Sequence, residues 1–190
     1  MTITPPERFT FGDLVLRRVR VDDAAMIAGT LADNWERLVA WIRSLSDEST
    51  TVEYQSSRLA AVHSGWEDGL RYEYVAVSRD AGAQLGSFWL DRRIGPDALE
   101  LGYWLTAAAS GRGYATAAAR LLTVAALELP GVHRVEIHCD PANQRSRLVP
   151  ERLGYRLDRV EADEVRARAE TGRSMIWIYP PTQPLPSGTN

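Results

Sequence analysis

Residues 110–116 read Ser-Gly-Arg-Gly-Tyr-Ala-Thr and stand between the predicted strand 99–105 and the predicted helix 113–129. Glycine lacks a Cβ, so the two glycines permit positive φ and let backbone amides converge on an anion. The helix that begins here adds unpaired N–H groups and the positive end of its dipole. The junction is therefore a competent site for a phosphate or diphosphate, and the arginine between the glycines adds a charged contact at its rim.

Other phosphate motifs do not fit this loop. No Gly-Lys-Ser/Thr follows, so it is not a Walker loop. The dinucleotide fingerprint would need a small residue at position 116, where Thr116 stands, and no acidic residue closes the next strand. The spacing alone leaves open that the two glycines only form a tight connection.

On both sides of this loop, segments whose hydrophobic residues recur at every second position alternate with segments whose hydrophobic residues recur with a period of 3.6. The first pattern indicates strands and the second indicates helices. Strands are predicted at 13–19, 71–78, 84–92, 99–105 and 132–139, followed by two more before residue 179. Helices are predicted from about residue 23, at 35–42, 50–66, 113–129 and 143–153. This order predicts a mixed α/β sheet with helices on both faces.

The bulk composition bounds the class of protein. The chain has 190 residues, 45% hydrophobic and 25% charged, which predicts one domain over residues 1–179. Residues 180–190 are proline-rich and are predicted to form a loose tail. A net charge of −3 gives no nucleic-acid footprint. No apolar run spans a membrane and Cys139 has no disulfide partner, so we expect a cytoplasmic protein without nucleic-acid or membrane partners.

Three segments in order carry a family resemblance: Glu100-Leu-Gly-Tyr-Trp-Leu105, then Gly-Arg-Gly-Tyr-Ala-Thr at 111–116, then Asn143-Gln-Arg-Ser146 with Leu153-Gly-Tyr155. Together they resemble the GNAT acetyltransferase superfamily, and more narrowly its branch of RimJ/RimL-type ribosomal-protein N-terminal acetyltransferases. The resemblance covers roughly residues 12–179. It implies the GNAT fold, a mostly antiparallel sheet of about six or seven strands, splayed between the fourth and fifth, with helices on both faces.

The resemblance implies acetyl-CoA as co-substrate and no metal. Its diphosphate would lie on the loop formed by Ser110, Gly111, Arg112, Gly113, Tyr114, Ala115 and Thr116. Ser110 replaces the family's usual Gln or Arg, but backbone amides would carry most phosphate contacts. The backbone of Trp104, Leu105 and Thr106 would bond the pantetheine arm. Asn143 would bond the pantetheine amides, and Ser146 would lie near the coenzyme sulfur, although Asn143 is also a good helix N-cap.

Pro150 departs from the family pattern because it lies inside the helix that starts near Asn143. Proline removes one helical hydrogen bond, and the carbonyl that it frees belongs to Ser146. We therefore expect a kink or an early end of this helix.

Acetyl transfer needs a base for the ammonium, a donor for the thioester oxyanion and a proton for the thiolate. Glu100, on the strand that would line the slot, and His138, on the next strand, are the two candidate bases. Their alternatives are a solvated strand-end carboxylate and a packed histidine. Ser146 is the family-based choice for the acid, and an amide near Leu105 is the candidate oxyanion donor. Cys139 lies in an apolar strand and is expected to be structural.

The acceptor amine stays open. The leading interpretation is a protein or peptide N-terminus, and the nearest alternative is a small amine such as an amino acid, a polyamine or an aminoglycoside. A non-catalytic acyl-CoA-binding domain is the third. A peptide needs an open groove whereas a small molecule can be enclosed, so pocket shape separates the first two. Relatives often pair, so a homodimer also stays open.

Overall fold

The computed structural model describes residues 3–179, and the tail predicted at 180–190 lies outside the described residues. The strands are β1 (Arg8–Phe11), β2 (Leu14–Arg18), β3 (Arg71–Ser78), β4 (Gln84–Asp91), β5 (Ala98–Leu105), β6 (Arg134–Cys139), β7 (Arg156–Ala162) and β8 (Arg173–Tyr179). The helices are α1 (Ala24–Asp33), α2 (Trp35–Leu38), α3 (Val52–Glu67), α4 (Tyr114–Leu127) and α5 (Gln144–Leu153), with 3-10 turns η1 (Val21–Asp23) and η2 (Asp47–Thr50).

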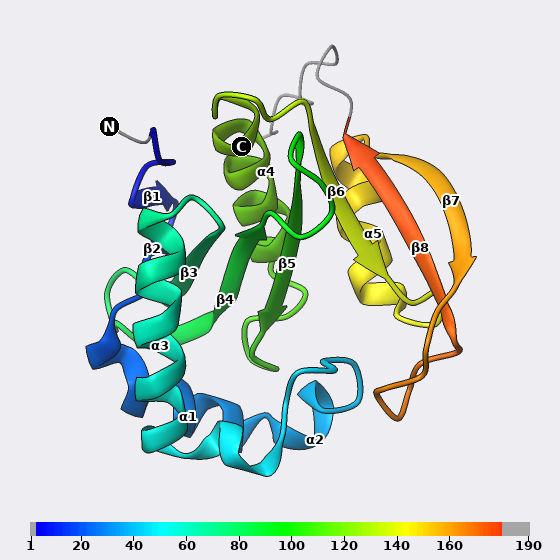
Figure 1. Ribbon diagram of the computed structural model, residues 1–190. Coiled ribbons are helices and arrows are strands. Elements are labelled where there is room, and N and C mark those ends of the chain that lie inside the picture. The colour runs from blue at the N-terminus through cyan, green and yellow to red at the C-terminus, as the bar shows by residue number, and fades with distance from the viewer. Residues whose placement is uncertain (1–2, 180–190) are drawn as a thin grey trace.

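Within residues 3–179 the strands form one sheet of eight, in the order β1-β2-β3-β4-β5-β6-β8-β7 (Figure 1). The prediction of about six or seven strands was therefore too low. The additional strand is β1, which pairs antiparallel with β2. Its residues are mostly exposed, so it carries no apolar alternation that would identify it in the sequence.

The sheet is splayed at the one parallel pair of strands within residues 3–179. β5 and β6 pair only over Ala98–Glu100 and Arg134–Glu136, while every other strand pair is antiparallel. Beyond these residues the two strands separate, and the gap widens toward the end of β5 (Figure 1). β5 and β6 are the fourth and fifth of the strands expected from the sequence, so the predicted splay is confirmed.

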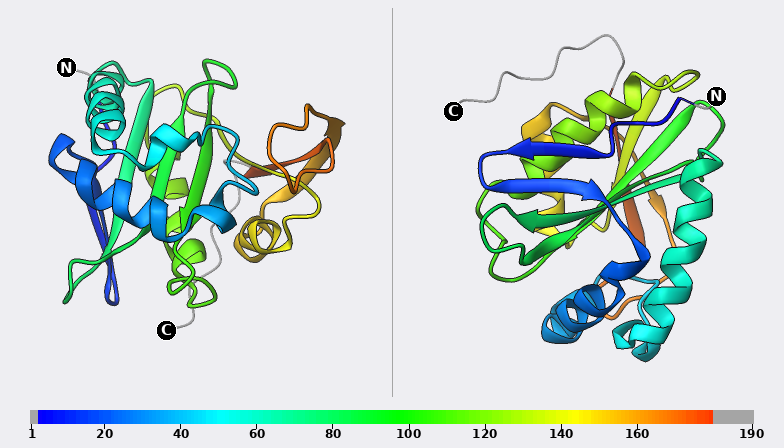
Figure 2. Two further views of the ribbon diagram at one scale, coloured as in Figure 1. Left: turned by 90° about the horizontal axis from the view of Figure 1, so that it is seen from below. Right: turned by 90° about the vertical axis from the view of Figure 1, so that its left-hand side faces the viewer.

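Helices cover both faces of the sheet, as predicted (Figure 2). Because side chains alternate across a strand, β2 sends Leu14 and Leu16 to one face and Val15 to the other. The first face packs against α4 in one apolar cluster, and the second packs against α1 and α3 in another. Buried alanines on α4, Ala118 and Ala119 among them, let that helix approach the sheet closely. No helix in the described part of the chain is long and apolar enough to span a bilayer.

Pro150 does not end its helix. α5 continues to Leu153 and is closed by Gly154 in the left-handed conformation, so the expected early end is wrong. The carbonyl that proline deprives of its helical partner, Ser146 O, instead accepts a hydrogen bond from the Tyr103 hydroxyl at 3.0 Å. A donor from β5 thus replaces the missing N–H, which removes the cost of leaving that carbonyl unpaired.

Candidate active site

The loop before α4 presents a row of free amides. Gly111 and Gly113 have φ of +79° and +81°, a region that other residues rarely adopt. The first hydrogen bond of α4 is donated by Ala117 N to Gly113 O, at 3.0 Å. Within the described residues, the N–H groups of 111–116 donate to no other group of the chain. Six consecutive unpaired amides at a helix N-terminus could hold an anion, which is the chemistry that the sequence predicts for this loop.

Side chains of this loop fasten it to its surroundings. Ser110 Oγ donates to Thr106 O at 2.9 Å, so this hydroxyl holds the turn after β5. The buried Tyr114 donates its hydroxyl to Asp13, with 2.7 and 2.8 Å to the two carboxylate oxygens. Arg112 lies over the Tyr114 ring, 5.0 Å from its centroid, and stays exposed at the rim. The loop is thus anchored while its backbone amides remain available.

Every second residue of β5 points its backbone N–H and C=O groups toward the gap between β5 and β6. Trp104 O faces β4, because a Cβ built on Gly86 would lie 2.1 Å from it. Thr106 N also faces β4 and donates to Leu85 O at 2.8 Å. Because successive peptide groups of a strand point to opposite edges, the Tyr103 and Leu105 amides point toward the gap. The Leu105 amide is therefore the one near the end of β5 that a ligand in the gap would meet.

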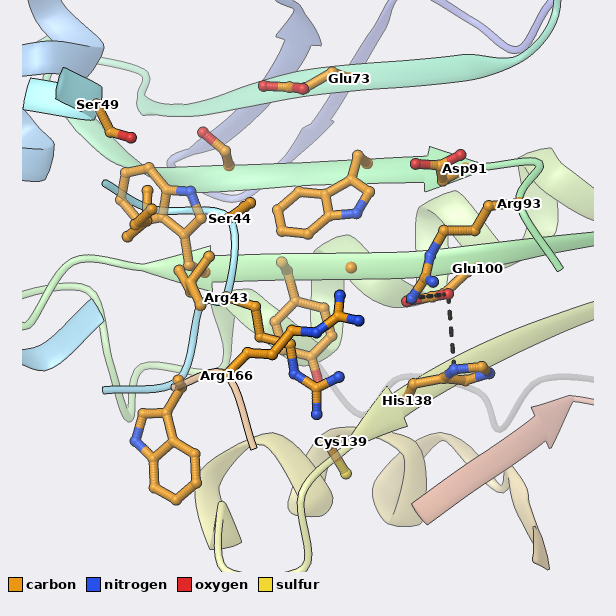
Figure 3. Close-up of a pocket in the computed structure, with 18 of the residues that line it drawn as sticks. Arg43, Ser44, Ser49, Glu73, Asp91, Arg93, Glu100, His138, Cys139 and Arg166 are labelled. Carbon is orange, nitrogen blue, oxygen red and sulfur yellow. Dashed lines mark hydrogen bonds and ion pairs between the residues drawn. The ribbon is translucent and has the colours of Figure 1, made fainter. Parts of the chain in front are cut away.

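The two predicted bases come together at the base of the gap (Figure 3). His138 Nδ1 lies 3.7 Å from Glu100 Oε2, and Arg93 forms an ion pair of 2.6 Å with the same oxygen. Glu100 is only 7% exposed, so it is not a solvated strand end. Both side chains line a cavity of about 650 Å³ between the sheet and the α1–α3 layer.

Glu136, which the motifs do not mark, completes this cluster. Its Cα pairs with that of Glu100 across β5 and β6, and its Oε2 lies 2.7 Å from His138 Nε2. Burial opposes its ionisation, but hydrogen bonds from His138 and Arg134 outweigh burial and hold the pKa of the Glu136 carboxyl below its usual range. His138 thus stands between two carboxylates. The sequence does carry a signal for Glu136. Side chains alternate between the two faces of a strand, so Glu136 and His138 in Val135-Glu-Ile-His-Cys139 lie on the same face.

Ser146 lies at the other wall of the gap, on the first turn of α5. Asn143 caps this helix, its Oδ1 accepting from Ser146 N at 3.2 Å. The Ser146 hydroxyl is 3.3 Å from the Tyr103 hydroxyl, and burial holds the pKa of Tyr103 well above its usual value. Neither Asn143 nor Ser146 bonds to Glu100 or His138 among the hydrogen bonds of residues 3–179. The predicted acid and the predicted bases therefore occupy separate clusters joined by β5.

Cys139 has the surroundings of a structural thiol. It is buried at the end of β6, and burial raises the pKa of its thiol to about 11. A thiol of this pKa is almost entirely protonated at neutral pH and is a poor nucleophile.

Two distant segments enclose one side of the cavity. The segment 36–43, which begins in α2, meets the β7–β8 connection, and both contribute lining residues. The contacts between them include Arg43–Asp163 at 2.8 Å, Arg168–Glu36 at 2.7 Å, Ala169 N to Ala40 O at 3.0 Å, and an ion pair between Arg43 and Glu170. On the cavity floor, Trp89 covers Gly102 so closely that a Cβ there would lie 2.2 Å from the indole.

The chain matches a known family and known structures. The family model described as "Acetyltransferase (GNAT) domain" matches residues 13–156. The Bacillus subtilis (strain 168) protein named "Putative ribosomal N-acetyltransferase YdaF" is 30% identical over 150 residues, 75% of this chain and 77% of that protein.

Two solved structures show how far the fold likeness extends. The ribosomal-protein-S5-alanine acetyltransferase of Vibrio fischeri superposes with a TM-score of 0.85 at 20% identity, covering 92% of this chain and 97% of that one. Mycobacterium smegmatis RimJ in complex with CoA-disulfide superposes with a TM-score of 0.78 at 20% identity, covering 88% and 81%.

Proposed function

The chain belongs to the GNAT acetyltransferase family, and from that we propose that it transfers an acetyl group from acetyl-CoA to the α-amine of a protein N-terminus. The observation that carries the cofactor is the row of free amides over residues 111–116 at the start of α4. The ribosomal names of its relatives support the acceptor and a cytoplasmic setting.

Acetyl-CoA would enter the gap between β5 and β6. Its diphosphate would accept from the amides of 111–116, and its pantetheine would run along the free edge of β5 toward Leu105. Asn143 and Ser146 would border the arm from the start of α5, with Ser146 near the sulfur. The Leu105 N–H would donate to the thioester oxygen as it becomes an oxyanion.

The amine must lose a proton before it attacks, because an α-ammonium has a pKa near 8. We assign the removal of this proton to Glu100 and His138, which lie 3.7 Å apart and both face the cavity. The nitrogen then bonds to the thioester carbon and the C–S bond breaks. The second amine proton passes to the thiolate through Ser146, whose hydroxyl has the protonated Tyr103 hydroxyl beside it. Each proton lost by nitrogen thus has a stated acceptor, and no covalent enzyme intermediate forms.

Glu136 would act as a positioning residue, because it holds His138 Nε2 and leaves Nδ1 toward Glu100. We expect Glu136→Gln to lower kcat about tenfold, since an amide holds the His138 ring less firmly than a carboxylate does. The affinity for acetyl-CoA stays unchanged. Asp97→Asn is the control, because Asp97 shares Arg134 with Glu136 but bonds nothing else in the cluster. A kcat equal to that of the wild type, or an equal loss in Asp97→Asn, would contradict this positioning role.

A small amine is the second candidate, favoured by the contacts between segment 36–43 and the β7–β8 connection, which close one side of the cavity. A panel of peptides with free N-termini, the same peptides blocked at the N-terminus, polyamines, aminoglycosides and amino acids separates the two. If the protein acetylates N-termini, we expect kcat/KM to be highest for the peptides with free N-termini. Turnover of small amines alone would favour the second candidate.

A further inference from the structure

The Tyr103 hydroxyl supplies a hydrogen bond that α5 cannot make within itself. In a regular helix Ser146 O would accept from the N–H of residue 150, but Pro150 has no N–H. The Tyr103 hydroxyl donates to this carbonyl instead, at 3.0 Å. Because a tyrosine hydroxyl carries a single hydrogen, the Ser146 hydroxyl, 3.3 Å away, is the donor in the second bond between the two residues. Tyr103 thus contacts both the backbone and the side chain of Ser146.

The Tyr103 ring is held from the β5 side. It stacks on the ring of Phe88 from β4, with the two centroids 5.7 Å apart, and Phe88 is fully buried. A ring fixed by stacking gives its hydroxyl a defined position. The position of Ser146 therefore follows that of β5.

The Tyr103–Ser146 hydrogen bond crosses the gap between β5 and β6. The pairing of these two strands ends at Glu100 and Glu136, so among the described strands the end of β5 is not joined to β6 by a ladder of hydrogen bonds. Helix α5 follows β6 in the chain and lies on its side of the gap (Figure 1). Tyr103 lies on β5 beyond the last paired residue. Its hydroxyl therefore links the two walls where the strands no longer do.

The two groups proposed to act on the thioester belong to opposite walls of this gap. The Leu105 N–H, the donor to the oxyanion, lies at the end of β5, and Ser146, which carries the proton to the sulfur, lies on α5. The thioester oxygen and sulfur are bonded to one carbon, so the two groups must keep a fixed separation to act on both. Tyr103 stands next but one to Leu105 and bonds Ser146 directly.

We propose that Tyr103 is a positioning residue for acetyl transfer, which sets the separation of the Leu105 N–H and Ser146 by donating to the carbonyl that Pro150 frees. The inference rests on the proposed use of acetyl-CoA. A shift of about 1 Å in a group that acts on the reacting atoms costs on the order of 100-fold in rate, so the effect falls on kcat. The free amides of 111–116 take no part in this link, so the affinity for acetyl-CoA does not depend on it.

The test is a double-mutant cycle on Tyr103→Phe and Pro150→Ala. Tyr103→Phe keeps the ring and removes the donor to Ser146 O, so we expect kcat to fall about 10- to 100-fold while the calorimetric affinity for acetyl-CoA stays unchanged. Pro150→Ala restores the helical N–H, which gives Ser146 O a donor within α5. We therefore expect the double variant to have a kcat within about threefold of that of Pro150→Ala alone.

Tyr155→Phe is the matched control, because Tyr155 is also a buried tyrosine whose hydroxyl bonds a neighbouring element, at Thr123 of α4. Thr123 keeps its own bond to Ala119 O at 2.7 Å in this variant. We expect Tyr155→Phe to lose stability in chemical denaturation and to keep the wild-type kcat, which separates positioning from stability.

Three outcomes overturn the inference while the proposed function stands. The first is a wild-type kcat in Tyr103→Phe, and the second is an equal loss of kcat in Tyr155→Phe. The third is a double variant about tenfold or more below Pro150→Ala alone, which decides the matter even where Tyr103→Phe by itself does not fold. If the wild type acetylates no amine, both the inference and the proposed function fail.

Discussion

Gly113→Glu abolishes the binding of acetyl-CoA and of desulfo-CoA in a calorimetric titration, with a loss of at least about 100-fold in affinity. Two effects add. The φ of +81° at this position is strained for any side chain, so the loop would shift its amides. The new carboxylate would also stand among amides that otherwise face phosphate oxygens, and like charges repel.

Gly131→Glu is the matched control for this loss. Gly131 lies beyond the other end of α4, also has a left-handed φ, +74°, and also has open space around a built Cβ. Its variant carries the same strain and the same charge without touching the loop. We expect it to lose stability in chemical denaturation yet to bind acetyl-CoA normally. If the two variants bind acetyl-CoA with equal affinity, the diphosphate does not bind at this loop.

Glu100→Gln and His138→Gln each lower kcat, by about 100- to 10,000-fold if the residue is the base and by less if it only assists. The affinity for acetyl-CoA is unchanged, because neither side chain lies on the loop of free amides. Steady-state kinetics with a saturating amine give kcat, and calorimetry gives the affinity.

The double variant shows whether Glu100 and His138 act together or independently. If Glu100 and His138 act as one unit, as their distance of 3.7 Å suggests, the double variant loses little more than the worse single variant. Asp91→Asn is the control, because Asp91 pairs with Glu100 in register on β4 and bonds Arg71 instead. Losses that multiply in the double variant would mean independent roles. An effect of Asp91→Asn equal to that of Glu100→Gln would mean that any carboxylate on this face serves.

The features that the sequence predicts are local ones. Gly111 and Gly113 adopt the positive φ that only glycine accepts easily, and period-two and period-3.6 patterns locate the elements that cover both faces. The partial pairing of β5 with β6, and hence the splay, came from the family resemblance rather than from periodicity.

Contacts that depend on register between distant segments were not predictable. Glu100 and Glu136 meet because three residues of β5 pair with three of β6, and no pattern within either strand encodes that register. Arg37 reaches Leu105 from a helix of one turn, and nothing in Trp35-Glu-Arg-Leu38 distinguishes it from a solvated charge. The sequence indicates that Pro150 frees Ser146 O, but the Tyr103 hydroxyl that donates to this carbonyl lies 43 residues away in the chain.

The most direct test of acetyl transfer is to measure released CoA thiol and acetylated α-amine in one reaction with a peptide that has a free N-terminus. The proposed mechanism predicts that the wild type releases one thiol for each α-amine acetylated, and that Glu100→Gln with His138→Gln binds acetyl-CoA but releases neither. Tight binding of acetyl-CoA by the wild type, with no acetylated product from any peptide or small amine, would contradict it and leave an acyl-CoA-binding domain.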